Sequence, residues 1–275
     1  MDFLLITRDP EVARYAIDCG VDRIFVDLEM HGKQERQGHL DAVMSGHCIA
    51  DIDFVRSAIG NSRLLVRINP IHQGTPAEVE SVLNAGADEI MLPMFRSAAE
   101  LEAIVCMVQG RARIIPLIET PAALTRLPRL LQVAGIDEFY LGLNDLHLAM
   151  QLDFMFELLA GGLIDHASTM LRAEGKRFGF GGIARLDQGE ISGEMVMGEH
   201  VRLGSSSVIL SRSFHGRSVC LADFRANIDL RQEVERLKSC QNNMATRAPL
   251  DIERHRRVAC AAVWKRIDMA GVLCQ

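Results

Sequence analysis

The sequence lacks several features that mark specialised classes of protein. Its 275 residues carry a formal net charge of −6, so it has no basic excess of the kind that binds nucleic acid or an anionic membrane. No apolar run approaches the roughly 18 residues that span a bilayer, and no basic segment precedes an apolar one at its start. We therefore expect no nucleic-acid partner, no membrane association and a cytoplasmic location.

Paired cysteines are also lacking. Seven cysteines are scattered along the chain, and no two of them form a CxxC pair. This spacing supports neither a zinc site nor a disulfide framework, so we expect reduced thiols. A Walker motif, a GxGxxG dinucleotide motif and a Gly/Ser-rich linker are absent as well.

What the sequence does contain is a regular alternation of short apolar runs and longer segments of helical spacing. Segments such as "SAAELEAIVCMVQG" end on glycine, a common stop signal for helices. Eight strand–helix units in a chain of this length favour an α/β fold of the closed (β/α)₈ TIM-barrel type over an open doubly wound sheet. The eight apolar runs cover residues 3–7, 23–29, 63–69, 89–94, 112–120, 138–145, 177–184 and 206–214.

Two regions exceed a minimal barrel. Residues 30–50 form a long polar excursion after the second run, and long loops of this kind are uncommon unless functional. Residues 240–275 follow the eighth unit and read as an amphipathic helix. We therefore predict a catalytic barrel domain over 1–239 and a C-terminal helical extension over 240–275, which serves packing or contacts within a homo-oligomer.

The polar residues of four runs fall at the end of the strand. Side chains alternate across a strand, so residues of equal parity share a face. If these faces point into the barrel, their charges gather at the C-terminal mouth, where barrel enzymes keep their chemistry. The four faces are Phe25, Asp27 and Glu29; Leu65, Arg67 and Asn69; Ile115, Leu117 and Glu119; and Phe139, Leu141, Leu143 and Asp145.

Glu119 and Asp145 lie about one βα repeat apart, which predicts adjacent strands and equal height. Two carboxylates placed in this way repel unless a cation joins them. Oxygen ligands with room for water suit Mg²⁺ or Mn²⁺ better than zinc. The alternative from the residues alone is a structural salt bridge between Glu119 and Arg67.

The motifs carry a family resemblance. "IPLIETPAAL" followed by "FYLGLNDLHLAM" resembles the paired signature of the HpcH/HpaI aldolase and citrate lyase β-subunit family, in which a strand ending in Glu precedes a strand ending in G-x-x-D-L. "LVRIN" resembles the arginine strand of that family, "DRIFVDLE" its second-strand acidic motif, and "ADEIMLPMFRSAAELEAIV" its fourth unit. The resemblance extends from about residue 20 to about 150 and weakens through the last two units.

The resemblance implies a barrel with a metal site. Glu119 and Asp145 would be the metal ligands. Arg67 would hold the carboxylate and the developing enolate oxygen of a pyruvate-like ligand. Asp27 and Glu29 would stand behind the ligands and orient water on the cation, with Asp27 also near the substrate and Glu29 among the catalytic groups.

The chain departs from the family pattern at two positions. The aldolase branch commonly has His directly after the second-strand Glu, whereas this chain has Met30, followed by His31. His31 is thus the candidate acid–base group, with water held by Glu29 as the alternative. The aldolase branch also tends to have Gln two residues before the metal Glu, and this chain has Leu117 there.

Further substrate contacts are predicted in the later units. Gly142, Leu143 and Asn144 precede the predicted ligand Asp145 in the G-x-x-D-L motif, and we expect them to line the substrate site. Arg212 ends the eighth run, a region of barrels that often holds anionic groups. It is a candidate for binding a carboxylate or phosphate on the half of the substrate that is not pyruvate.

Together these features predict a Mg²⁺- or Mn²⁺-dependent carbon–carbon lyase of class II aldolase type. It would form or cleave a bond to the enolate carbon of pyruvate or oxaloacetate, with an aldehyde or keto compound as co-substrate. No strand end presents a lysine suited to imine formation. The alternatives are an acyl-CoA lyase of citramalyl- or malyl-CoA type, an enolate-condensing synthase, and a non-catalytic barrel acting as a binding or assembly subunit.

Overall fold

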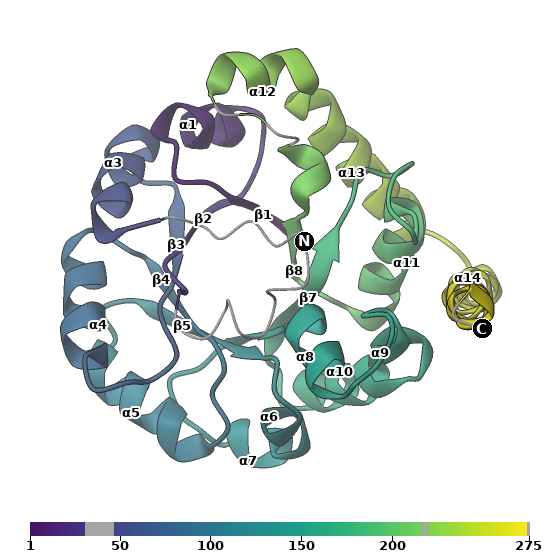
Figure 1. Cartoon of the computed structure of the whole chain (residues 1–275), viewed down its shortest axis with the longest axis horizontal. Helices are drawn as coiled ribbons and strands as arrows, with labels where there is room; N and C mark the ends of the chain where they lie inside the picture. Colours follow the sequence, from purple (N-terminus) through teal and green to yellow (C-terminus); the bar gives the residue numbers. More distant parts are fainter. Residues whose placement is uncertain (31–46, 216–217, 219, 274–275) are drawn as a thin grey trace.

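The computed structural model describes residues 1–30, 47–215, 218 and 220–273. Eight parallel strands close into a barrel in sequential order, as predicted, and helices surround it (Figure 1). The strands are β1 (Asp2–Ile6), β2 (Arg23–Asp27), β3 (Arg63–Arg67), β4 (Glu89–Leu92), β5 (Arg113–Ile118), β6 (Glu138–Leu141), β7 (Arg177–Ile183) and β8 (Ser207–Leu210).

The helices follow the strands in a (β/α)₈ order, which confirms the predicted fold class. Several begin with side-chain caps, such as Asp9 before the first helix and Ser97 before α5, which satisfy backbone N–H groups of the first turn. The helices are α1 (Pro10–Asp18), α3 (Ile49–Ile59), α4 (Thr75–Asn84), α5 (Ala98–Val108), α6 (Pro121–Thr125), α7 (Leu127–Leu130), α8 (Leu143–Ala149), α9 (Glu157–Ala160), α10 (Leu163–Ala173), α11 (Gly193–Leu203), the 3₁₀ turn η1 (Arg212–Phe214), α12 (Leu221–Asn227), α13 (Leu230–Ala245) and α14 (Pro249–Leu273).

The interior of the barrel is filled by one small apolar cluster, separate from the larger core between strands and helices. Phe25, Leu65, Ile115 and Leu117 point inward, as the alternation of the sequence predicts. The remaining members of the inner cluster are Leu4, Met91 and Tyr140.

The predicted face of the sixth run is wrong. Tyr140 is the inward residue of β6, whereas Phe139, Leu141 and Leu143 belong to the outer core. The strand ends at Leu141, and Leu143 already begins α8. The alternation of a strand therefore does not extend to Asp145, which lies in the first turn of a helix.

The floor of the barrel is closed by charged side chains. Arg23, the first residue of β2, is fully buried and forms ion pairs with Asp2 and with two carboxylates, Glu89 at 3.1 Å and Glu138 at 2.9 Å. The Ser207 hydroxyl donates a hydrogen bond of 2.8 Å to Glu138. Four buried polar residues from the four even-numbered strands thus form one layer, as in the layered packing of such barrels.

The first residues of the odd-numbered strands surround this layer on the solvent side. Arg63 and Arg177 pair with Asp2 at 3.0 and 2.8 Å, and Arg113 pairs with Glu89 at 3.4 Å. The side chains of these three arginines remain 35–44% exposed, and that of Asp2 is 19% exposed. Every strand therefore starts on a polar residue, and these ion pairs connect the buried layer to the solvent-facing arginines.

The last helix stands outside the ring of helices that surrounds the barrel. α13 packs against α11 within the ring, whereas α14 lies beyond it (Figure 1). The predicted domain boundary between residues 239 and 240 falls inside α13. His255 of α14 sits over Gly198 of α11, where any Cβ would come within 2.0 Å of the His255 Nε2 atom. An ion pair of 3.2 Å between Arg256 and Asp165 adds to this docking.

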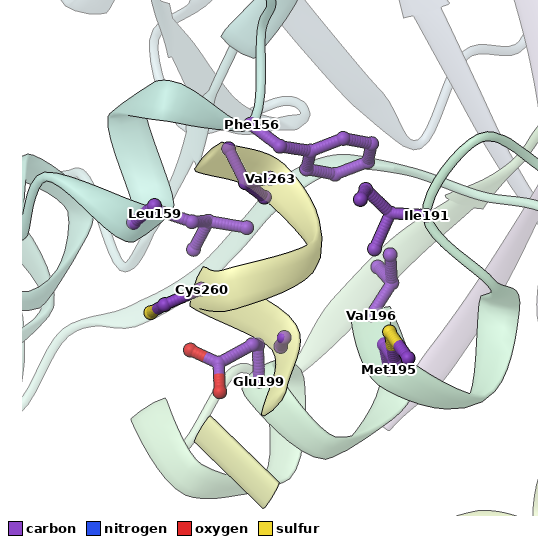
Figure 2. Close-up of a pocket in the computed structure, with 10 residues that line it drawn as sticks. Phe156, Leu159, Ile191, Met195, Val196, Glu199, Cys260 and Val263 are labelled. Atoms are coloured by element: carbon purple, nitrogen blue, oxygen red, sulfur yellow. The ribbon is translucent and has the colours of Figure 1, made fainter. Parts of the chain in front are cut away.

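A narrow, mostly apolar pocket lies where α14 packs against α9 and α11. Val263 and Cys260 of α14 face Phe156, Leu159 and the α11 residues that Figure 2 shows. The outer side of α14 exposes large apolar side chains, namely Leu250, Val258, Trp264 and Met269. The association of this chain into a homo-oligomer stays a prediction.

Within the described residues, no helix combines the length and the apolar character needed to cross a membrane. The six cysteines in this part of the chain are all free thiols.

Candidate active site

Arg67 is the centre of a charged group at the C-terminal mouth. Its guanidinium forms a fork with Asp27, in which Nε donates to Oδ1 at 2.8 Å and Nη2 to Oδ2 at 2.7 Å. A third nitrogen lies 3.2 Å from Oε2 of Glu29. Burial alone would lower the pKa of Arg67, but Asp27, Glu29 and Glu119 more than offset this and raise it. The guanidinium also lies 5.7 Å from the centroid of the Phe25 ring, which supports it from below.

Glu119 follows the last residue of β5 and is almost fully buried. Its Oε1 accepts a hydrogen bond of 2.9 Å from the Met94 backbone N–H. Burial raises the pKa of Glu119 to about 8, with Asp145 and Glu29 acting in the same direction and with Arg67 and the Met94 amide opposing it. In the absence of a cation, the folded protein therefore favours the neutral form of Glu119 at neutral pH.

Met94 holds its amide toward Glu119 in an uncommon conformation. Its φ angle of 55° lies in the left-handed region, which non-glycine residues seldom adopt. The turn directly after β4 and Pro93 thus supplies a backbone donor to the carboxylate that follows β5.

Asp145 reaches the mouth from α8. It lies in the first turn of that helix and is 8% exposed. Gly142, which caps α8, passes so close to Glu119 that a Cβ there would lie 2.8 Å from the Glu119 Cβ atom and 2.9 Å from Oε2. Any larger side chain at position 142 would collide with Glu119, so glycine allows α8, which carries Asp145, to begin this close to Glu119.

The structure thus combines the acidic residues and the arginine that the sequence predicts. Arg67 forms its ion pairs with Asp27 and Glu29. The alternative prediction, a structural salt bridge between Arg67 and Glu119, is therefore not found among the described residues. Asp145 lies close enough to Glu119 for its charge to contribute to the raised pKa of Glu119.

This pair fits a divalent cation. Two carboxylates and space for water or substrate oxygens are a common donor set for Mg²⁺, which seldom takes an all-protein cage. The described residues contain no cluster of three or more His, Cys, Asp or Glu side chains arranged to hold a metal. A bound cation would also relieve the repulsion between the two carboxylates.

The other predicted residues lie in several places. Leu143 is buried in the outer core, so only its backbone is available to a ligand, whereas Asn144 is partly exposed. Arg212 is exposed in η1, which follows β8 at the mouth end of the barrel. His31 lies outside the described residues. Met30, which stands where the aldolase branch has His, is 55% exposed.

Sequence reasoning missed His47. Its Nδ1 accepts a hydrogen bond of 3.0 Å from the backbone N–H of Asp27, the last residue of β2. This bond requires that the neutral ring carry its proton on Nε2. No motif marks His47 in the sequence, because its place depends on the return of the chain from the long excursion after β2.

A closed (β/α)₈ barrel with its acidic and basic side chains gathered at the C-terminal mouth has the architecture of barrel enzymes. The family model for HpcH/HpaI aldolase/citrate lyase matches residues 3–181, and the chain belongs to this family. Family membership supports a function of aldolase or lyase type.

Solved structures share the fold at low sequence identity. An HpcH/HpaI aldolase from Desulfitobacterium hafniense DCB-2 is 19% identical with a TM-score of 0.61, over 86% of this chain and 92% of that chain. An HpcH/HpaI aldolase/citrate lyase family protein from Burkholderia cenocepacia J2315 is 14% identical with a TM-score of 0.62, over 86% and 94%.

Citrate synthase SbnG has the same fold at 15% identity and a TM-score of 0.61, again over 86% of this chain and 94% of that chain. No protein with a curated description matches the sequence. At these identities the structural likeness establishes the fold alone.

Proposed function

We propose that this protein is a Mg²⁺- or Mn²⁺-dependent carbon–carbon lyase of aldolase type. It forms or cleaves a bond to the enolate carbon of pyruvate or oxaloacetate, with an aldehyde or keto compound as the second substrate. One observation carries the proposal: the buried carboxylate of Glu119, at the mouth of the barrel, lies within electrostatic range of a second buried carboxylate, Asp145, and of the Arg67 guanidinium.

Glu119 and Asp145 would hold the cation. When bound, a divalent cation acts as a Lewis acid that stabilises negative charge on the keto oxygen of the substrate. Arg67 is held rigidly by Asp27 and Glu29, and its remaining N–H groups are suited to the carboxylate of a keto acid. Rigid support of this kind orients the keto acid before the bond changes.

In the bond-forming direction, the predicted base, either His31 or water held by Glu29, takes a methyl proton and leaves the enolate, whose carbon attacks the carbonyl carbon of the co-substrate. The carbonyl π electrons move onto oxygen, which then takes the proton back from that base. Arg67 would oppose the charge on the enolate half, as would a cation held by Glu119 and Asp145, and Arg212 is the proposed contact for an anionic group on the other half.

A condensing synthase is the second candidate. The solved structure of SbnG, which its name describes as a citrate synthase, shares the barrel. Both functions require the same enolate, so they differ in the co-substrate and in the product. Product analysis with aldehydes, keto acids and acyl-CoA esters separates these two candidates and the acyl-CoA lyase.

Exchange of the methyl protons of pyruvate tests the proposal without knowledge of the co-substrate. In deuterated water with Mg²⁺ or Mn²⁺, we expect NMR to show loss of the pyruvate methyl signal, and a chelator should stop it. Enzyme-dependent exchange that persists in chelator would contradict the metal requirement. No exchange with either metal, together with no metal binding by calorimetry, would favour a non-catalytic binding subunit.

Arg67→Lys should separate metal binding from keto-acid binding. Lysine keeps the positive charge beside Asp27 and Glu29 but lacks the planar fork that holds a carboxylate. We expect at least about tenfold weaker binding of oxalate, a pyruvate-enolate mimic, as expected for the loss of a charge-assisted hydrogen bond. Mn²⁺ affinity should change by less than about threefold.

Calorimetry measures both affinities on the same protein. Arg129→Lys, an exposed arginine of α7, is the matched control and should leave both unchanged. An oxalate affinity of Arg67→Lys equal to that of the wild type would remove Arg67 from the substrate site.

A further inference from the structure

Strands β7 and β8 change register near the mouth. Gly179 pairs with Ser207, but the next pair is Gly182 with Ile209, so β7 has one residue more than β8 over this interval. Such an irregularity leaves backbone groups without ladder partners and bends the strand. The bulge lies directly beside β6, which precedes the predicted ligand Asp145.

The hydroxyl of Tyr140 fills the gap. It donates a hydrogen bond of 2.7 Å to the Gly181 carbonyl of β7 and accepts one of 2.9 Å from the Ile209 N–H of β8. Tyr140 is 1% exposed and points inward from β6. A Cβ at Gly179 would lie 2.4 Å from the Tyr140 ring, so this glycine makes room for it. One phenol thus joins three neighbouring strands at the bulge.

The bulge in turn supports α8. Gly181 has a φ angle of +50°, and a Cβ there would lie 2.8 Å from Cδ1 of Leu143. Leu143 is the first residue of α8 and is buried between the bulge and the outer core. On the other side, Gly142 is packed against Glu119. The start of α8 is therefore packed on both sides, with Leu143 against the bulge and Gly142 against the Glu119 side chain.

We propose that Tyr140 is a positioning residue, which sets the start of α8 through Gly181 and Leu143 and so holds Asp145 beside Glu119. The hydroxyl touches neither carboxylate and acts through packing alone. Its effect on metal affinity rests on the proposed function, whereas its effect on the start of α8 does not.

Tyr140→Phe is the direct test, because it removes the bridging oxygen and keeps the ring. Tyr15→Phe is the matched control, since Tyr15 is the only other tyrosine and lies in α1. The measurement is the hydrogen-exchange rate of two backbone amides in the metal-free wild type and in both variants. The Ile209 amide reports the bridge, and the Leu146 amide, which donates to the Gly142 carbonyl at 3.2 Å, reports the start of α8.

We expect both amides to exchange at least about tenfold faster in Tyr140→Phe than in the wild type, since a buried hydrogen bond contributes about 1.4 kcal/mol or more when its loss strands a partner. Tyr15→Phe should leave both rates unchanged. Unaltered exchange at Leu146 in Tyr140→Phe would overturn the proposal, because α8 would then not depend on the bridge.

Mn²⁺ affinity, measured by the EPR signal of the free ion, gives the functional readout. Loss of a residue that orients metal ligands typically weakens binding 10- to 100-fold, and we expect about tenfold for Tyr140→Phe. Leu237→Ala, a buried change in α13 away from the mouth, controls for general destabilisation and should bind Mn²⁺ as the wild type does.

Equal weakening in Leu237→Ala and Tyr140→Phe would reduce Tyr140 to a structural residue and overturn the proposal. If the wild type bound no Mn²⁺, the proposed function would fail, and the Leu146 exchange rate alone would decide whether Tyr140 positions α8.

Discussion

Glu119→Gln should lose metal-dependent exchange of pyruvate protons and yet be more stable than the wild type in metal-free buffer at pH 8. Glutamine keeps the shape of the side chain, but its amide is a far poorer ligand for Mg²⁺ than a carboxylate. We expect exchange to fall by at least about a thousandfold, which corresponds to about 4 kcal/mol of transition-state stabilisation.

The stability gain follows from the raised pKa of Glu119. Its folded-state pKa of about 8 lies above the ordinary value of 4.5, since burial disfavours the charge. The wild type therefore loses stability relative to the unfolded chain as pH rises from 4.5 to about 8, by at most about 1.4 kcal/mol per pH unit. Glutamine has no charge to bury, so its advantage should grow through this window and then level off.

Urea denaturation at pH 5, 6.5 and 8, with and without Mg²⁺, measures this effect. Mg²⁺ should stabilise the wild type and leave the Gln variant unchanged. Glu100→Gln is the control, because Glu100 lies in the first turn of α5, outside the mouth group. A Glu119→Gln protein that exchanges pyruvate protons at the wild-type rate would remove Glu119 from the metal site.

Arg23→Met should destabilise the fold by about 3–5 kcal/mol, the usual cost of removing one partner from a buried ion pair. Arg23 is fully buried, and its removal leaves Glu89 and Glu138 in the barrel floor without their nearest cation. Arg177→Met removes a neighbouring arginine that is 44% exposed, and should cost less than about 1 kcal/mol.

The midpoint of urea denaturation at pH 7 compares the two variants. Replacing the two carboxylates as well, in Arg23→Met/Glu89→Leu/Glu138→Leu, should recover most of the loss, because no buried charge then lacks a partner. If Arg23→Met cost no more than Arg177→Met, the floor would not depend on this ion pair.

Much of the fold follows from local features of the sequence. Each of the eight strands begins within one residue of the first residue of a predicted apolar run. The runs are easy to recognise because strands in parallel barrels are buried on both faces, whereas the helices between them are amphipathic. The gathering of Asp27, Arg67 and Glu119 at the mouth follows from the same pattern, since these side chains come at or just after the ends of their strands.

What could not be predicted depends on contacts distant in the sequence. Asp145 reaches the site from a helix, so the alternation of a strand gave the wrong reason for its place. His47 binds Asp27 after a long excursion, and the Met94 amide reaches Glu119 through a left-handed turn. The sequence did not predict the charged floor, because Arg23 and Glu138 are single polar residues at the starts of two strands that are far apart in the sequence. Only closure of the barrel brings them into contact.

The sealed floor has a kinetic consequence. Arg23, Glu89, Glu138 and Ser207 are each at most 1% exposed, so the floor of the barrel is closed to reactants, which would approach the proposed site from the opposite end. The keto acid would have to enter first and the co-substrate would then lie above it. A two-substrate reaction here should follow compulsory-order kinetics, with the keto acid binding first and, in the cleavage direction, leaving last.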